Sequence, residues 1–123
     1  VRFDRVLVDA PCSGTGTLRR NPEIKWRLAA EDLPRFASLQ TGLLASAAER
    51  VLPGGRLVYS TCSLEPEENE HVAAAFLAGS PEFRHVTAGL PPGLCTPEGF
   101  VRTYPHRNGS DGFFAAVFER RNA

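Results

Sequence analysis

The apolar residues of this chain fall into two kinds of pattern, which predict different elements. The run RVLVD at residues 5–9 is apolar and β-branched and ends in turn-forming residues, so it predicts a buried strand. From residue 32 to residue 52 the apolar positions recur at helical spacing, which predicts an amphipathic helix whose apolar stripe belongs to the core. Pro34 lies in the first turn of this helix, where its missing N–H is tolerated.

A second strand and a second helix follow. The tripeptide PGG at residues 53–55 is predicted to end the first helix, and RLVYST at residues 56–61 is predicted to be another buried strand. The second helix is expected to begin near Pro66 and to run to Gly79, because proline and acidic residues favour a helix start. The acids near its start are interpreted as charges that stabilise this end of the helix: Glu65, Glu67, Glu68 and Glu70.

Shorter segments make up the last third of the chain. We expect a short strand at residues 83–88, a Pro/Gly-rich surface loop at 89–99, a strand near 100–105 and a final strand at 112–120. Strands that alternate with helices predict an α/β fold with right-handed crossovers and a largely parallel sheet. The last strands are expected to form an antiparallel edge.

Ligands bind α/β sheets of this kind beyond the carboxyl ends of the parallel strands. Residues 9–16 follow the first strand and residues 61–65 follow the second, so both segments are expected on one rim. Cys12 lies in the first segment and Cys62 in the second, and each is followed by serine. The two thiols are therefore predicted to share one functional edge.

Composition limits the broad class of the protein. With 123 residues and 42% hydrophobic residues, the chain is one small domain or part of one. Fourteen basic and fourteen acidic residues cancel, so the net charge neither indicates nor excludes a nucleic-acid partner. Lys25 is the only lysine among the basic residues; the others are arginines, which suit planar phosphate contacts.

The cysteines and the hydropathy pattern indicate the compartment. Three cysteines without CxxC spacing favour neither a disulfide framework nor a zinc site, so a reducing cytoplasmic setting and no metal are expected. No run approaches the ~18 apolar residues of a membrane span, and no signal peptide is recognisable. Because the sequence contains no Met and Val1 lies just before a strand, we expect it to be a piece of a longer protein.

The residues alone leave two interpretations of the cysteines open. A cysteine is often a small buried hydrophobic residue, and Cys95 in the Pro/Gly-rich loop is interpreted in this way. Cys12 and Cys62 also suit a nucleophilic role, since side chains at strand ends are exposed and nearby helix N-termini favour the thiolate. Asp9, three residues before Cys12, adds a carboxyl group to the same rim.

Three motifs in order resemble those of the Sun/Fmu-type RNA cytosine-5 methyltransferases. They are DAPCSGTGTLRRNPEIKWR at 9–27, LPGGRLVYSTCSLEPEENE at 52–70 and PHRNGSDGFFAAVFER at 105–120. The similarity spans nearly the whole chain and is weakest between about residues 80 and 100. It implies the C-terminal half of a Rossmann-like class I methyltransferase sheet, with parallel strands and an antiparallel edge. Ala10, Pro11 and Cys12 stand where amino-group methyltransferases carry a polar-Pro-Pro-aromatic turn, which favours attack on a carbon.

The resemblance also implies roles for the rim residues. In the RNA enzymes the Thr-Cys thiol is the nucleophile, so Cys62 is expected to attack the cytosine and Cys12 to assist product release. Asp9 is expected to stabilise charge at ring nitrogen 3. Asp9 and Pro11 are expected to contact the cofactor, S-adenosyl-L-methionine. The residues alone do not rank the two thiols.

RNA is the expected partner, with ribosomal RNA favoured and transfer RNA as the alternative. Arg19, Arg20, Lys25 and Arg27 cluster after the first motif and suit phosphate contacts, although a solvated basic loop is an equal interpretation. His106 is a further candidate for phosphate contact, although surface histidines are commoner.

The cofactor half of the site is not recognisable. GTGTLRR at 14–20 lacks the third glycine of a GxGxxG fingerprint, and PGG precedes a strand instead of following one. Residues 1–123 are therefore expected to be the C-terminal part of a methyltransferase domain, inactive alone and prone to self-association. Two alternatives remain: a non-catalytic RNA-binding or scaffold piece, and a cysteine-dependent hydrolase or redox enzyme. Neither cysteine motif contains a histidine base for the latter.

Overall fold

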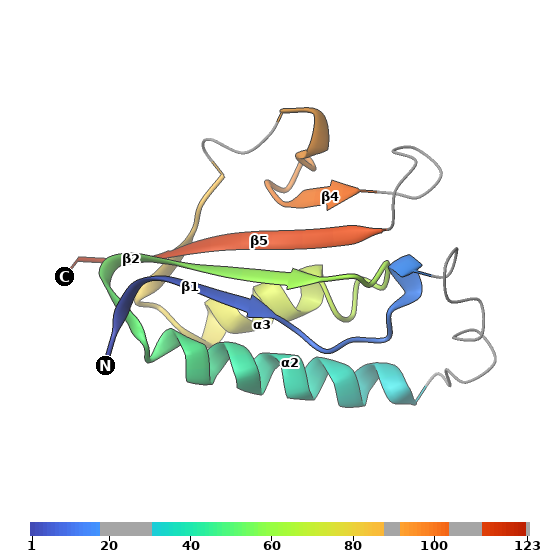
Figure 1. Cartoon of the computed structure of the whole chain (residues 1–123), viewed down its shortest axis with the longest axis horizontal. Coiled ribbons are helices and arrows are strands. Elements are labelled where there is room, and N and C mark those ends of the chain that lie inside the picture. Colours follow the sequence, from blue (N-terminus) through green and yellow to red (C-terminus); the bar gives the residue numbers. More distant parts are fainter. Residues whose placement is uncertain (18–30, 88–91, 104–111, 123) are drawn as a thin grey trace.

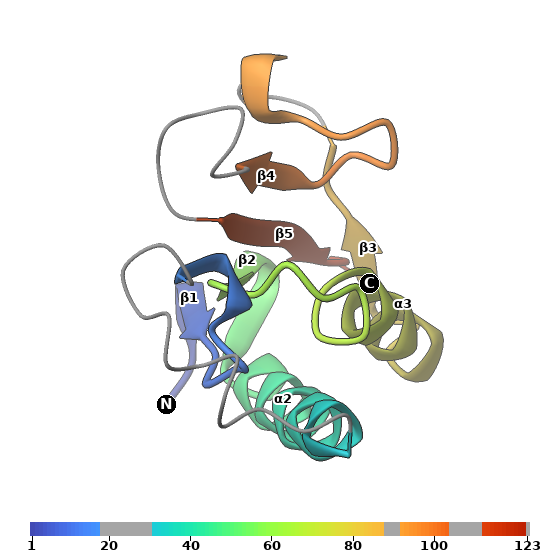
Figure 2. The same ribbon diagram turned by 90° about the vertical axis from the view of Figure 1, so that its right-hand side faces the viewer.

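A mixed sheet with two helices on one face forms the described part of the chain (Figures 1 and 2). The structure is a computed structural model that describes residues 1–17, 31–87, 92–103 and 112–122. Its strands are β1 (Phe3–Asp9), β2 (Val51–Thr61), β3 (Phe83–His85), β4 (Val101–Thr103) and β5 (Phe113–Arg120). Its helices are α2 (Asp32–Ala48) and α3 (Glu70–Gly79), with short 3-10 turns at η1 (Thr15–Thr17) and η2 (Pro92–Leu94).

One antiparallel strand is inserted among strands that all run the other way. β1 and β2 are parallel, while β5 pairs antiparallel with β2 on one side and with β3 and β4 on the other. The order is therefore β1-β2-β5-β3, with β4 beside β5. The α/β class agrees with the prediction, but only β1 and β2 form a parallel pair among the described strands, so the prediction of a largely parallel sheet is wrong. The antiparallel strand, however, lies inside the described sheet, because β5 fills the space between β2 and β3.

The core lies between the sheet and the two helices. Leu57 and Tyr59 of β2 and Phe118 of β5 are fully buried against Leu44 of α2 and Phe76 of α3. Burial of each such apolar side chain contributes about 1.5–3 kcal/mol. Within the described residues, no helix is both long enough and apolar enough to cross a membrane.

The opposite face of β1 and β2 is open. Side chains alternate along a strand, so Leu7 of β1 points away from the helices and is 66% exposed. Leu7 pairs with Val58 of β2, and these two residues help to line a shallow hollow on this face. Sheets with parallel strands are normally covered on both faces. This apolar surface is therefore unusual for a parallel pair.

Two boundaries differ from the sequence prediction for identifiable reasons. Helix α2 ends at Ala48, and β2 already begins at Val51, so the tripeptide PGG lies inside a strand. Pairing with β1 passes from Phe3↔Val51 to Arg5↔Arg56, which makes residues 52–55 a bulge. Gly54 has φ +81, a conformation that favours glycine.

The second boundary is the start of α3. The helix begins at Glu70 and not near Pro66, because residues 66–69 form turns that direct the Glu68 side chain into the protein.

Candidate active site

The carboxyl ends of β1 and β2 bring the two cysteine loops together. Asp9 and Ser60 are paired in the parallel ladder, and the Ser60 hydroxyl donates to Asp9 Oδ1 at 3.3 Å. Beyond this pair the chain leaves both strands on the same rim, and Cys12 Sγ lies 3.5 Å from Cys62 Sγ. The structure therefore brings together the two thiols that the sequence placed on one edge.

Two glycines allow three segments to cross tightly beside the thiols. Gly16 N–H donates to the Cys62 carbonyl at 2.7 Å, and Gly112 N–H donates to the Gly16 carbonyl at 2.7 Å. A Cβ atom on Gly16 would overlap both the Gly112 and the Cys62 carbonyl groups. Backbone hydrogen bonds thus connect the loop after β1 with the loop after β2 and with the residue before β5.

Burial changes the acidity of one thiol. Burial and, to a smaller extent, the adjacent Cys62 together raise the pKa of Cys12 to about 12. Backbone hydrogen bonds from Cys62 and Gly14 act in the opposite direction but do not offset the burial. Cys12 therefore keeps its proton through neutral pH.

Glu68 is a functional candidate that the sequence interpretation missed. It was expected to be a helix-start charge, but its side chain is fully buried. Ser13 donates to the carboxylate twice, from N–H to Oε1 at 2.8 Å and from its hydroxyl to Oε2 at 2.6 Å. The Ser63 hydroxyl donates to Oε2, and Gln40 Nε2 donates to Oε1 at 3.1 Å. One carboxylate therefore binds the residue after each of the two cysteines.

Further hydrogen bonds fix the loop that follows β2. The Thr61 hydroxyl donates to Asn69 Oδ1 at 2.6 Å, and Asn69 Nδ2 donates to the Ser63 carbonyl at 2.8 Å. The Tyr59 hydroxyl donates to the Glu68 carbonyl at 2.6 Å, and burial raises the pKa of this phenol strongly. The backbone on both sides of Cys62 is consequently held by buried polar groups.

Asp9 and Pro11 are the two predicted cofactor contacts, and both are exposed at the rim. The Pro11 carbonyl accepts a hydrogen bond from Gln40 Nε2 at 2.9 Å, which connects the loop after β1 to α2. An exposed carboxylate and an exposed proline ring beside a pair of thiols suit contact with a polar ligand that also has apolar parts.

Other sequence candidates lie outside the rim or outside the described residues. Arg19, Arg20, Lys25, Arg27 and His106 belong to the segments that the structure does not describe. Cys95 is exposed, and its sulfur contacts the Thr96 carbonyl at 3.5 Å. Among the described residues, no group of three or more His, Cys, Asp or Glu side chains could hold a metal ion.

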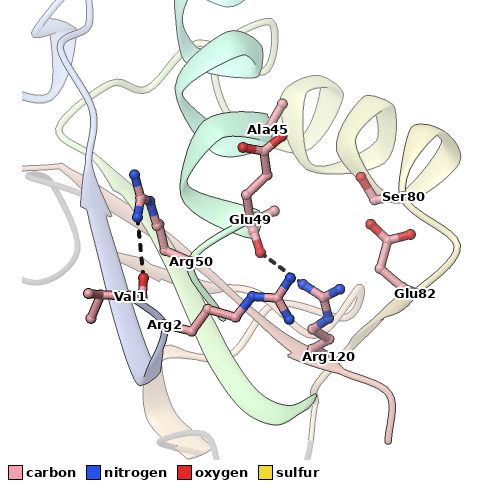
Figure 3. Close-up of a pocket in the computed structure, with 9 residues that line it drawn as sticks. Val1, Arg2, Ala45, Glu49, Arg50, Ser80, Glu82 and Arg120 are labelled. Carbon is pink, nitrogen blue, oxygen red and sulfur yellow. Dashed lines mark hydrogen bonds between the residues drawn. The ribbon is translucent and has the colours of Figure 1, made fainter. Parts of the chain in front are cut away.

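A cavity lies at the other end of the sheet from the thiols (Figure 3). Its volume is about 620 Å³, and charged residues from the start of β1 and the end of β5, including Arg2 and Arg120, line it. Arg120 donates to the carbonyls of Ala48 and Val51, so its guanidinium is partly occupied by the backbone. Since β1 and β2 run away from this cavity toward the thiols, it is separate from the cysteine rim.

Comparison with known proteins identifies related sequences. A sequence model of the family described as 16S rRNA methyltransferase RsmB/F matches residues 1–119. The chain is 44% identical to ribosomal RNA small subunit methyltransferase B of Klebsiella pneumoniae (strain 342) over 98% of its own length and 27% of that protein. It is 47% identical to the protein of the same name from Thermus thermophilus, over 99% of this chain and 30% of the relative. The chain thus spans less than a third of these relatives.

Two solved methyltransferase structures are also similar to this chain. A methyltransferase homologue from Pyrococcus horikoshii matches with a TM-score of 0.76 and 35% identity, over 98% of this chain and 40% of that one. NSun6 from Pyrococcus horikoshii, solved with SFG, matches with a TM-score of 0.84 and 27% identity, over 100% of this chain and 31% of that one.

Proposed function

The chain belongs to the RsmB/F family of 16S rRNA methyltransferases, and we propose that it carries the base-modifying part of an RNA cytosine-5 methyltransferase site. The contact between Cys12 and Cys62 carries this proposal, since a thiol nucleophile with a second thiol beside it matches the chemistry of carbon-5 methylation.

Carbon 5 of cytosine is a weak nucleophile until a thiolate adds to carbon 6. In the proposed reaction the Cys62 sulfur bonds to carbon 6, and the electrons of the 5,6 double bond make carbon 5 nucleophilic. Asp9 would hold a proton at ring nitrogen 3 and so reduce the charge that develops there. Its exposed carboxylate at the carboxyl end of β1 supports this assignment.

Release of the product reverses the addition. After methylation the carbon-5 proton passes to a base, the 5,6 double bond re-forms, and the bond between carbon 6 and the Cys62 sulfur breaks. Cys12 would assist this elimination from its position in contact with that sulfur. The resemblance to the RNA enzymes, in which the Thr-Cys thiol attacks, is what assigns the nucleophile to Cys62.

When bound, S-adenosyl-L-methionine supplies the methyl group. Asp9 and Pro11 are the described residues proposed to contact it, and their exposure beside the thiols is compatible with such a ligand. The related NSun6 structure contains SFG, an analogue of this cofactor. Two contacts are too few for a complete cofactor site, so the remainder is proposed to come from outside residues 1–123.

We further propose that this chain is the C-terminal part of a larger catalytic domain. The exposed Leu7 and Val58 face supports this, because parallel strands normally have both faces covered. The relatives are more than three times as long as the matched segment. Ribosomal RNA is the proposed substrate of the complete protein, with transfer RNA as the alternative. Arg19, Arg20, Lys25, Arg27 and His106 are proposed phosphate contacts.

The proposal is tested by methyl transfer in the full-length protein. Small-subunit ribosomal RNA and bulk transfer RNA are each incubated with the protein and methyl-labelled S-adenosyl-L-methionine, and 5-methylcytosine is mapped by bisulfite sequencing. We expect label at carbon 5 of one ribosomal cytosine with the wild-type protein and none with Cys62→Ala. RNA binding without transfer would favour a non-catalytic scaffold, and thiol-dependent hydrolysis without RNA would favour a different enzyme class.

A further inference from the structure

Glu68 connects the two loops that carry the thiols. Ser13 directly follows Cys12, and Ser63 directly follows Cys62. Both serine hydroxyls donate to Oε2 of Glu68, and the two hydroxyl oxygens are only 3.4 Å apart. The carboxylate is therefore a common acceptor for two loops that lie 50 residues apart in the sequence.

The burial of Glu68 makes these hydrogen bonds obligatory. A fully buried carboxylate loses its hydration, and this loss is tolerated only when several donors replace the water. Here both oxygens are occupied, Oε1 by Ser13 N–H and Gln40 Nε2, and Oε2 by the two serine hydroxyls. Moving the Ser13 loop away would remove two of these four donors from the buried carboxylate, and moving the Ser63 loop away would remove one.

Glu68 is itself held in place by its own backbone. Its carbonyl accepts the hydrogen bond from the Tyr59 hydroxyl, and its N–H donates to the Glu65 carbonyl at 3.0 Å. Tyr59 belongs to the carboxyl-terminal part of β2 and is fully buried. The carboxylate thus provides a fixed point that is anchored to the sheet, against which both cysteine loops are placed.

We propose that Glu68 is a positioning residue that holds the thiols of Cys12 and Cys62 in contact through Ser13 and Ser63. This inference rests on the proposed function for its consequence, since addition by Cys62 and elimination assisted by Cys12 both need the two sulfurs at the same base. Glu68 acts through the serines and is not a catalytic residue itself.

The thiol contact can be measured without any catalysis. In the full-length protein, diamide takes up two hydrogen atoms from a pair of thiols and leaves a disulfide. Mass spectrometry then follows the peptide in which Cys12 is joined to Cys62. The alkylation rate of each thiol by iodoacetamide serves to correct for changes in exposure. This rate of disulfide formation reports how often the two sulfurs meet.

Four variants separate positioning from general stability. Glu68→Gln places an amide donor against groups that are themselves donors, and Ser63→Ala removes one of the two connections. Ser63→Thr keeps the hydroxyl, and Glu67→Gln changes an exposed acid beside Glu68. We expect the corrected rate to fall about tenfold or more in Glu68→Gln and Ser63→Ala, since small displacements of reacting groups have large effects on rate. It should stay at the wild-type value in Glu67→Gln and return toward it in Ser63→Thr.

Kinetics provide a second measurement. We expect kcat for methyl transfer to fall about 10²-fold in Glu68→Gln while KM for RNA stays constant, because only the reacting groups are displaced. The double variant Ser63→Ala, Glu68→Gln should be no slower than Glu68→Gln alone, because both changes break the same connection.

A thiol contact that does not depend on Glu68 or Ser63 would overturn the inference. Wild-type disulfide rates in folded Glu68→Gln and Ser63→Ala, with only a lower melting temperature, would show a merely structural role. If Glu68→Gln does not fold, the comparison of Ser63→Ala with Ser63→Thr decides the question. If the wild-type protein transfers no methyl group while its disulfide rate still depends on Glu68, the proposed function fails and the positioning role stands.

Discussion

The sulfur atoms of Cys12 and Cys62 lie 3.5 Å apart, although 50 residues separate them in the chain. The parallel pairing of β1 and β2 produces this contact, because it brings Asp9 beside Ser60 and lets both loops leave the sheet at one edge. Both thiols are half-buried, and burial together with the adjacent Cys62 raises the pKa of Cys12 to about 12.

The first prediction separates the roles of the two thiols in the full-length protein. Cys62→Ala should abolish both methyl transfer and any covalent adduct with RNA, because the bond to carbon 6 cannot form. Cys12→Ala should let the adduct form and persist, since elimination is slowed. Denaturing electrophoresis of the protein with labelled RNA measures the adduct. Both variants should stay folded, because each change removes a single sulfur atom from a half-buried side chain.

The reverse result would contradict this assignment. If Cys62→Ala trapped RNA and Cys12→Ala formed no adduct, the nucleophile would be the thiol of the Pro-Cys turn. Cys95→Ala is the matched control, because the Cys95 side chain is exposed and its thiol contacts the carbonyl of the neighbouring Thr96. It should leave both adduct and methyl transfer at wild-type levels.

The second prediction concerns the glycine crossing beside the thiols. Gly16→Ala should destabilise the protein by about 1–3 kcal/mol, because the new methyl group meets two backbone carbonyls that cannot move independently. Urea titration followed by circular dichroism measures the free energy of unfolding. The variant should also slow formation of a disulfide between Cys12 and Cys62, since the Gly16 N–H bonds the Cys62 carbonyl.

Gly42→Ala is the control for that substitution. Gly42 lies in α2 on the exposed side, and a Cβ atom there would meet nothing within 4 Å. Alanine at this position should stabilise the protein by about 0.5–1 kcal/mol, because it favours the helix over the unfolded chain. Equal effects of both substitutions would show that backbone entropy, and not the crossing, determines the result at Gly16.

Elements with strong local patterns could be predicted from the sequence. The run at residues 5–9 corresponds to β1, and the helical stripe from residue 32 corresponds to α2. The final apolar run corresponds to β5. The rim could also be predicted, because parallel strands share their carboxyl edge. The position of β5 inside the sheet could not be predicted, because the local sequence of a strand does not determine which strands it pairs with.

The burial of the polar residues could not be predicted from the sequence either, for a different reason. Glu68 stands in the acidic run EPEEN, where a solvent-exposed charge at a helix start is the usual outcome. Its burial depends on donors from Ser13, Gln40 and Ser63, which become neighbours only when two loops and α2 have packed. The serine after each cysteine was the available signal, since two such hydroxyls on one rim can donate to one shared acceptor.

The third prediction is a pH dependence of stability that comes from His85. Burial lowers the pKa of this imidazole below its ordinary value, and a backbone hydrogen bond with Gly99 only partly opposes the effect. The ring stacks on Phe100 with centroids 4.7 Å apart. Between its unfolded and folded pKa values the unfolded chain binds the proton more readily, so stability is retained above about pH 6.5 and falls as the pH decreases below it.

Replacement of the imidazole tests this dependence. His85→Phe keeps an aromatic ring on Phe100 but cannot take up a proton, so the loss of stability between about pH 7 and about pH 5 should be smaller than in the wild type. His71→Gln, on the exposed face of α3, is the control and should leave the pH profile unchanged. Parallel profiles for His85→Phe and the wild type would mean that other groups cause the acid sensitivity.

The last prediction concerns the open face of the sheet. Leu7 is 66% exposed beside Val58, on strands whose opposite face packs against two helices. An exposed apolar face next to an edge of β1 that pairs with no other described strand favours association, so the isolated chain should self-associate as its concentration rises. Leu7→Lys should shift sedimentation toward the monomer, because a charged side chain resists burial between two copies. It should leave the fold unchanged, since Leu7 points away from the core.

Thr41→Lys, a polar substitution on the helix side of the molecule, provides the comparison and should not alter the association. A wild-type chain that sediments as a monomer at every concentration would show that this face does not need a cover, and would weaken the proposal that the chain is part of a larger domain.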